Sequence, residues 1–379
     1  MRRRNHGISE RLVIAAVALL ALAGCSGTPS SDTTLSALSD LRSGSSDADA
    51  GEKNILIADQ FNNRVIEIDP RGDIVWSFGK GPSDLSPLSI IGVNDAERIG
   101  PFTLMAGTGA PPGTEPACPD AVNGCPDNRV LLVDHKGRVV WQYGQFAVTG
   151  SGPDELNTPV QNTWLPDEHV LITDQGNQRV IEVTLSKEIV WQYGTTGLSG
   201  SGPDQLNSPN SAELLRNGHV LIADENNNRA IEVTHDKQIV ATFTAGGSVS
   251  GVAFASRLPD GHTLITDSNN SRIVEVDATD KIVWQYVTNL QPGSNPSPLP
   301  TRAVRLEGGD TLISDQFNHR VIRVNTAGSI VASYGNLNAP GFGTMNVSQG
   351  LNGPYDAKVI GDFTGLTPPF FEDSDQDRD

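Results

Sequence analysis

Short apolar runs separated by polar turns fill the central part of the chain. In the stretch 170–194, three runs rich in β-branched and aromatic residues follow one another: Val170–Thr173, Arg179–Val183 and Ile189–Tyr193. Their length and composition predict β-strands. The turn between the first two, 174–178, contains Asp, Gln, Gly and Asn, which favour tight turns. The stretch therefore predicts a unit of three strands joined by two turns.

This unit recurs along the chain. Its most regular part is a D-x-x-N-x-R core, found at Asp59/Asn62/Arg64, Asp174/Asn177/Arg179, Asp224/Asn227/Arg229, Asp267/Asn270/Arg272 and Asp315/Asn318/Arg320. A sixth copy keeps only its second half, from Asn128-Arg129 to Trp141. Several short strands per unit at a period of about 43 to 65 residues are typical of a β-propeller. We therefore expect an all-β, six-bladed propeller of four-stranded antiparallel blades.

The two ends of the repeat array predict how the ring closes. Interior units begin with an additional strand, as in 206–215, whereas the first unit starts directly at Asn54–Asp59. A matching segment, 351–360, stands at the far end with no D-x-x-N-x-R core after it. We expect this C-terminal segment to complete blade 1 as its innermost strand, which would leave no open sheet edge between the first and last blades.

The repeated residues are expected to be structural. An Asp and an Arg five residues apart across a strand–turn–strand can form a charge-assisted pair braced by the Asn. Because the set recurs in five units, it is expected to hold blades together rather than bind a ligand. The set comprises Asp59, Arg64, Asp174, Arg179, Asp224, Arg229, Asp267, Arg272, Asp315 and Arg320. Trp76, Trp141, Trp191 and Trp284, on outer strands, are expected to pack between blades.

Two segments of the repeat array resemble NHL repeats: LIADQFNNRVIEID (56–69) and GSGPDQLNSPNSAELLRNGHVLIADENNNRAIEV (200–233). The resemblance extends over nearly the whole repeat region and is specific for the fold. NHL-type propellers serve as scaffolds, receptor-like binders and occasionally enzymes, so the resemblance alone implies no single function.

The second halves of two units are also similar to repeats of quinoprotein-type and arylsulfotransferase-like propellers. These segments are IDPRGDIVWSF (68–78) and VDHKGRVVWQYG (133–144). Quinoprotein dehydrogenases usually have eight blades, so six blades argue against a quinone, and we expect no cofactor. Transfer of aryl sulfate in the second group depends on a His supported by Arg. No motif here assigns that role to a particular His, and no catalytic residue is predicted.

The N-terminus predicts export and lipid attachment. Residues 1–24 combine a basic head with an apolar run too short to be a permanent membrane span. The run ends in Leu22-Ala23-Gly24-Cys25, which resembles a prokaryotic lipobox. That resemblance implies cleavage before Cys25 and acylation of its sulfur; the alternative is an ordinary signal peptide that happens to precede a Cys. We expect an extracytoplasmic protein, in the periplasm or at the cell surface, anchored to a membrane by lipid.

Domain boundaries follow from composition. Residues 25–53 are rich in Ser, Asp and Gly and are expected to form a flexible tether, whereas 54–366 hold the propeller. Residues 367–379 form an acidic tail. Its alternating Asp residues resemble calcium ligands, but it lacks the turn Gly and distal Glu, so a solvated end is expected.

Charge limits the partners. The chain carries a formal net charge of −18, and the loss of residues 1–24, with four Arg and one Glu, would make it −21. Such an acidic domain is a poor binder of nucleic acid, so we expect none as a partner. The expected partners are the membrane, through the lipid anchor, and a protein or small extracellular ligand; a monomer is expected. Of the three Cys, Cys118 and Cys125 are expected to form a disulfide, since a metal site would require more ligands than their loop offers.

Departures from the repeat are the candidate functional features. Blade 2 carries an insertion of about 20 residues, Gly107–Asp127, a candidate lid or recognition loop. Phe61 and Phe317, in neighbouring blades across the closure, are expected to cluster with His319, either as apolar cover or as a binding patch. The remaining candidates, for binding an anion in the channel, are Arg257, Arg302 and Arg305.

Histidines recur at two repeat positions. His169, His219 and His262 precede the second strand, and His135 and His235 follow the third. A triplet meeting near the axis would bind a metal, but a turn residue carried by the repeat is the simpler interpretation, so no metal is predicted. The leading functional hypothesis is therefore a binding scaffold acting through its top-face loops. The alternative is an enzyme of sulfotransferase-like or lyase type with its site in the channel.

Overall fold

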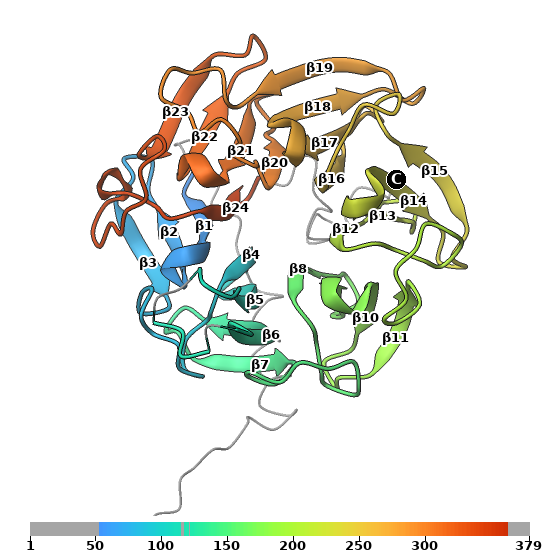
Figure 1. Cartoon of the computed structure of the whole chain (residues 1–379), viewed down its shortest axis with the longest axis horizontal. Helices are drawn as coiled ribbons and strands as arrows, with labels where there is room; N and C mark the ends of the chain where they lie inside the picture. The colour runs from blue at the N-terminus through green and yellow to red at the C-terminus, as the bar shows by residue number, and fades with distance from the viewer. Residues whose placement is uncertain (1–52, 115–116, 121, 363–379) are drawn as a thin grey trace, which may run out of the picture.

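The computed structural model describes residues 53–114, 117–120 and 122–362. Within them, six four-stranded antiparallel sheets are arranged in a ring, as expected for a six-bladed propeller (Figure 1). Blade 1 has the strand order β24 (Pro354–Val359), β1 (Ile55–Asp59), β2 (Arg64–Ile68) and β3 (Ile74–Phe78), from the axis outward.

The other five blades use consecutive strands. Blade 2 contains β4 (Val93–Ile99), β5 (Phe102–Ala110), β6 (Cys125–Asp134) and β7 (Val139–Tyr143). Blade 3 contains β8 (Pro159–Trp164), β9 (Val170–Asp174), β10 (Arg179–Val183) and β11 (Ile189–Tyr193). Blade 4 contains β12 (Pro209–Leu214), β13 (Val220–Asp224), β14 (Arg229–Val233) and β15 (Ile239–Phe243). Blade 5 contains β16 (Val252–Arg257), β17 (Thr263–Asp267), β18 (Arg272–Val276) and β19 (Ile282–Val287). Blade 6 contains β20 (Arg302–Arg305), β21 (Thr311–Asp315), β22 (Arg320–Val324) and β23 (Ile330–Gly335).

Ring closure by the C-terminal strand is confirmed. β24 pairs antiparallel with β1, with Ala357 opposite Ile57. The first and last described segments of the chain therefore share one sheet. Residues Ile57, Ile66, Val321, Leu351 and Ala357 pack in one apolar cluster across the junction between blades 6 and 1.

Burial follows position in the blade. The second strands β1, β9, β13, β17 and β21 are buried along their whole length, because each is covered on both faces by neighbouring blades. Outer strands alternate, and β3 has every second side chain exposed until Phe78. The core is thus a set of apolar layers between blades.

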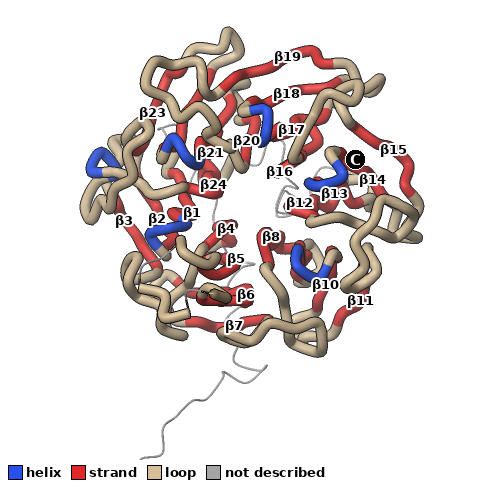
Figure 2. The backbone as a smooth tube through the Cα atoms, in the orientation of Figure 1, coloured by secondary structure: helices blue, strands red, loops and turns tan. Residues whose placement is uncertain are grey.

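Each D-x-x-N-x-R core forms a turn with a short 3-10 helix, η2 (Gln60–Asn62) to η6 (Gln316–Asn318), drawn in blue in Figure 2. In blade 3, the Asp174 Oδ2 atom accepts hydrogen bonds from Asn177 Nδ2 (2.7 Å) and Arg179 Nε (2.8 Å). Asp174 Oδ1 accepts from the backbone N–H of Asn157 (2.8 Å) in the loop that enters the blade. Asn177 also donates to Gly150 O (2.7 Å). The turn therefore ties two strands to the preceding interblade loop.

The outer-strand tryptophans join four of the six blades to the next blade. Trp76, Trp141 and Trp191 each donate an Nε1–H hydrogen bond of 2.9 Å to a backbone carbonyl in the outer turn of the following blade. Trp284 does the same at 3.2 Å. The acceptors are His135, Leu185, His235 and Thr326. Two of the repeat-borne histidines thus lie at blade junctions.

Blade 2 rebuilds the turn with a different Asp. Asp127 lies two residues before Arg129 rather than five, yet its Oδ1 pairs with Arg129 Nε at 2.5 Å. Its Oδ2 accepts from the N–H of Ile91 (2.7 Å) in the entering loop. The sequence comparison placed only Asn128 and Arg129 in register, because it required the spacing of the other five copies. The predicted insertion therefore ends on a structural residue.

The ring has two distinct faces. We call the face with η2–η6 and the interblade loops bonded to them the turn face. The second strands run toward this face and end at its turns. Ile55, the first residue of β1, and its partner Val359 therefore lie at the opposite face, where Ile360 N–H bonds Asn54 O (2.9 Å) and Lys53 Nζ bonds Gly361 O (2.7 Å). We call this the terminus face, since both ends of the described chain lie there. Among the described residues, no helix has the length and apolarity to cross a membrane.

We expect replacement of Arg179 by Leu to lower the free energy of unfolding by about 3–5 kcal/mol, because it leaves the fully buried Asp174 carboxylate without its cation. Arg138→Leu is the matched control. Arg138 also pairs with an Asp, but its side chain is 73% exposed, so the loss should stay below about 1 kcal/mol. Urea denaturation of both variants measures the difference; equal losses would contradict a structural role for the buried pair.

Candidate functional site at the propeller axis

The innermost strands bring one variable position from each blade to the axis. Each strand except β8 has an Ala in the same register against the second strand: Ala96, Ala212, Ala255, Ala303 and Ala357. The residue before this position differs between most blades. These residues are Asp356, Asp95, Gln161, Ser211, Phe254 and Arg302, from blade 1 to blade 6. Acidic, basic, neutral polar and aromatic side chains all occur at this position.

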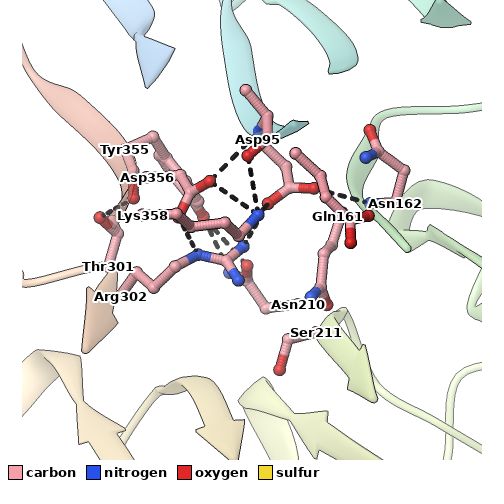
Figure 3. Close-up of polar contacts among 12 residues, drawn as sticks. Asp95, Gln161, Asn162, Asn210, Ser211, Thr301, Arg302, Tyr355, Asp356 and Lys358 are labelled. Carbon is pink, nitrogen blue, oxygen red and sulfur yellow. Dashed lines mark hydrogen bonds and ion pairs between the residues drawn. The ribbon is translucent and has the colours of Figure 1, made fainter. Parts of the chain in front are cut away.

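Four of the charged side chains form a buried cluster (Figure 3). Arg302 Nη2 donates to Asp95 Oδ1 (2.8 Å), and Arg302 Nε lies 2.6 Å from Asp356 Oδ1 as an ion pair. Lys358 Nζ donates to Asp95 Oδ1 (2.7 Å) and lies 3.0 Å from Asp356 Oδ2. Two carboxylates and two cations from blades 1, 2 and 6 thus neutralise one another, as burial of charge requires.

The surroundings shift the pKa values of the two carboxyl groups in opposite directions. Burial raises the pKa of Asp95, although Lys358 and Arg302 oppose it. Burial also acts to raise the pKa of Asp356, but there Arg302 and Lys358 outweigh it, and the pKa of this carboxyl is lowered. Arg302 lies with its guanidinium 4.2 Å from the centroid of the Phe254 ring, which covers its face. The ion pairs and the Phe254 ring therefore hold the side chains of the cluster in place.

The same position also links adjacent blades. Asp356 and Asp95 each accept a backbone N–H from the inner strand of the next blade, from Ala96 (3.2 Å) and Asn162 (3.1 Å). Gln161 Oε1 accepts from Ala212 N–H (2.6 Å) in the same way, and Ser211 Oγ accepts from Ala255 N–H at 3.3 Å. The axial edge of each inner strand pairs with no other strand, and these side chains accept hydrogen bonds from some of its backbone N–H groups.

A second layer crosses the axis. Asn210 of blade 4 and the Tyr355 hydroxyl of blade 1 hydrogen-bond each other, at 2.9 and 3.1 Å, although these blades stand opposite in the ring (Figure 1). Asn210 Nδ2 also donates to Glu225 Oε2 (2.8 Å), which Gln175 Nε2 approaches at 3.3 Å. Burial raises the pKa of Glu225. Side chains of the protein itself therefore occupy the axis at two levels.

The two exceptional aromatics meet on the turn face. The rings of Phe61 and Phe317 are stacked, with centroids 6.1 Å apart. His319 Nδ1 accepts the N–H of Gly353 (3.1 Å), and a Cβ at Gly353 would lie 2.4 Å from the Phe61 ring. Both rings are half-buried. The expected cluster across the closure is present; its role in binding stays a prediction.

The three candidate anion-binding arginines are each engaged by carboxylates. Only Arg302 lies in the axial cluster. Arg257 Nη2 donates to Glu232 (2.8 Å) and Arg305 Nη2 to Glu275 (2.8 Å), in each case in the preceding blade. Arg98 and Glu67 form the same pair between blades 1 and 2. The recurrence of this pair indicates a joint between blades, and anion binding by these residues stays a prediction.

The three histidines before the second strands occupy separate blades and do not form a common group in the described residues. Each pairs with a Glu of the third strand in its own blade. The Nδ1–Oε1 distances are 2.6 Å for His169–Glu182 and 2.7 Å for both His219–Glu232 and His262–Glu275. The same cross-strand position holds Asn54–Glu67 in blade 1 and Asp310–Arg323 in blade 6. A polar pair at this position is thus part of the repeat.

The blade 2 insertion extends a hairpin of that blade. β5 and β6 continue their pairing out to Ala110 opposite Cys125, past the length of the other blades' strands. Cys118 and Cys125 form the predicted disulfide, with Cα atoms 5.7 Å apart. The insertion projects from the turn face, where it replaces a 3-10 turn.

Two carboxyls on the inner strands titrate near neutral pH. Burial raises the pKa of Glu213 to about 8, and that of Glu97 to about 7 against the nearby charge of Lys358. Each accepts a backbone N–H from the next blade, Glu213 from Arg257 (3.1 Å) and Glu97 from Trp164 (2.9 Å). Glu97 and Lys358 also line a pocket on the terminus face with Leu56, Arg98 and Val359–Asp362.

Of the residues at the axis, Arg302 was predicted from the sequence, whereas the following were not: Asp95, Asn210, Tyr355, Asp356 and Lys358. The available signal was the Ala of the inner strands. Aligning the copies on that residue shows an ionisable side chain before it in three blades. The missed cluster is a departure from the repeat, like the insertion, but it lies on the strand with the least regular sequence.

Comparison with known proteins supports the fold and nothing finer. No protein-family model matches the chain, and no curated protein matches it. A protein of unknown function from Bacteroides caccae is similar in structure, with a TM-score of 0.52 and 14% identity over 78% of this chain and 97% of that chain. Virginiamycin B lyase from Staphylococcus aureus gives 0.47, with 16% identity over 76% and 85% of the two chains. A streptogramin B lyase structure gives 0.44, with 16% identity over 76% and 74%.

Between about pH 4.5 and 8, the free energy of unfolding is expected to decrease less steeply with rising pH in the Glu213→Gln variant than in the wild type. The folded protein keeps the Glu213 proton over this range while the unfolded chain loses it, so stability falls as the pH rises. Its slope should change by at most about 1.4 kcal/mol per pH unit. Urea titrations at several pH values measure this, with exposed Glu188→Gln as the control. Parallel curves for wild type and Glu213→Gln would contradict the raised pKa.

Proposed function

We propose that the protein is a lipid-anchored, extracytoplasmic scaffold that binds a partner protein through its turn face. One observation carries the proposal: the loops of this face expose large apolar side chains. Leu88 is 75%, Leu198 47% and Leu290 76% exposed. Isolated exposed apolar residues are common, but their recurrence on rigid loops of one face favours a docking surface.

The loops that carry these side chains are held firmly. Carbonyls on both sides of Leu88, of Pro87 and Ser89, accept hydrogen bonds from Arg129 (2.9 and 2.8 Å). Gly197, next to Leu198, donates its N–H to Asn177 O (2.8 Å). Gln291, next to Leu290, accepts from Arg320 (2.7 Å). The D-x-x-N-x-R cores, and Arg129 of the altered turn in blade 2, thus present the apolar side chains in fixed positions, which reduces the entropy lost on binding.

The orientation relative to a membrane follows from the chain ends. Lys53 and Asp362 lie on the terminus face, and the proposed anchor, Cys25, precedes Lys53 by a segment outside the described residues. A tether attached there leaves the turn face, on the opposite side of the ring, free to meet a partner. The axial side chains bond one another across the ring, which supports binding at the loops over chemistry in the channel.

Replacing Leu88, Leu198 and Leu290 together by Ser is expected to reduce recovery of the partner at least tenfold, because docking would bury these side chains. The measurement is quantitative cross-linking of the full-length protein in its own cells. The control replaces three exposed apolar residues of the outer strands, Val190 (49% exposed), Val240 (52%) and Val283 (47%), by Ser, and should leave recovery unchanged. If the partner is recovered with the turn-face variant but lost with the control variant, the interface lies on the outer strands and the proposal is wrong.

Cys25→Ala is expected to move the protein from the membrane fraction to the soluble fraction, because the acyl chains would have no sulfur to attach to. Fractionation followed by immunoblotting measures this. Persistence in the membrane fraction would show that something other than a Cys25 lipid holds the protein there.

A further inference from the structure

We propose that the terminus face binds a divalent transition-metal ion at Asp167, His169 and Glu182 of blade 3, with a weaker copy of the site in blade 5. In blade 3, His169 Nδ1 lies 2.6 Å from Glu182 Oε1 and 3.0 Å from Asp167 Oδ2. The three ligand atoms lie within 4.8 Å of one another. One imidazole nitrogen and two carboxylate oxygens are donors that suit Zn²⁺ and its neighbours rather than Ca²⁺ or Mg²⁺.

The His–Glu pair alone is a repeated structural contact, as blade 4 shows. The third group sets blades 3 and 5 apart. A neutral imidazole has one N–H and can satisfy one carboxylate well, so a second carboxylate at the same nitrogen adds repulsion that a cation removes. When the imidazole proton is on Nε2, the Nδ1 lone pair is free for a metal, and the two carboxylates supply the opposing charge.

The three histidine blades form a graded series. In blade 5, Asp260, His262 and Glu275 repeat the geometry, with Nδ1–Oδ2 at 3.4 Å and Nδ1–Oε1 at 2.7 Å. There Arg305 holds the other Glu275 oxygen at 2.8 Å, and its charge opposes a bound cation. Within the described part of the chain, no Arg pairs with Glu182; Leu214 lies at the register of Arg257 and Arg305.

Blade 4 is the natural control. Asn217 takes the place of the Asp, donates 3.1 Å to Glu232 and accepts from His219 N–H (3.0 Å), while Arg257 engages the same Glu at 2.8 Å. An amide supplies no negative charge, so this copy lacks one anionic ligand and keeps the opposing cation. We therefore expect affinity to fall in the order blade 3, blade 5, blade 4.

The test is calorimetric titration of the purified full-length protein with Zn²⁺ alone, repeated with Mg²⁺. We expect one tighter Zn²⁺ site and a weaker one, and no Mg²⁺ binding at the same concentrations. Asp167→Asn, which copies blade 4, should weaken the tighter site at least tenfold, whereas Asp260→Asn should affect only the weaker one. Asp154→Asn, on the turn face, is the control. Both variants keep an oxygen that can accept the turn hydrogen bond, so folding should be preserved, and circular dichroism checks it.

A spectroscopic readout distinguishes ligation from loose association. Cu²⁺ bound at one equivalent should show electron paramagnetic resonance splitting from a single imidazole nitrogen, lost in His169→Asn. Absence of Zn²⁺ binding up to millimolar concentration would overturn the proposal, as would tight-site binding that survives the double variant Asp167→Asn/Asp260→Asn.

Discussion

Pairing of β24 with β1 is the contact on which the rest of the structure depends. It joins segments about 300 residues apart and turns an open array of sheets into a ring, whose first and last blades would otherwise expose apolar faces. The same pairing carries Tyr355, Asp356 and Lys358 to the axis. It also fixes both ends of the described chain on one face, opposite the turns that carry the exposed apolar side chains.

Closure explains why the axis is polar and also filled. Inner strands have no partner on their axial edge, so their N–H groups need acceptors, and side chains of adjacent blades supply several. The two cations and two carboxylates then balance one another in a site that excludes most water. Such a network favours one arrangement of the six blades over others, a role that does not require a ligand.

Repetition and deviation have separate meanings here. The buried Asp174–Arg179 pair and its counterparts fasten each blade to the loop before it, so their repetition reflects a structural need that every blade shares. The His–Glu pairs show how a structural contact can gain a further property in single copies: a second acidic group, Asp167 or Asp260, turns two of them into candidate metal sites. Departures of this kind, the exposed loop leucines among them, are where function is best sought.

The sequence alone determined the number of blades, the strand pattern, the closure by the C-terminal segment and the disulfide between Cys118 and Cys125. The first three depend on local spacing and on the pattern of apolar residues, which repeat and are therefore visible without coordinates. The disulfide followed from an even pair of Cys in a chain expected to be exported. Tertiary structure decided which residues meet across the ring. Asn210 and Tyr355 are 145 positions apart, and Arg302 reaches Asp95 over 207. No local pattern encodes such contacts, because they exist only once the curvature of six packed blades brings opposite strands together. Asp127 was recognised as the missing Asp of blade 2 only from its bond to Arg129, for a different reason: it stands two residues before the Arg rather than five, so the repeat spacing does not reveal it.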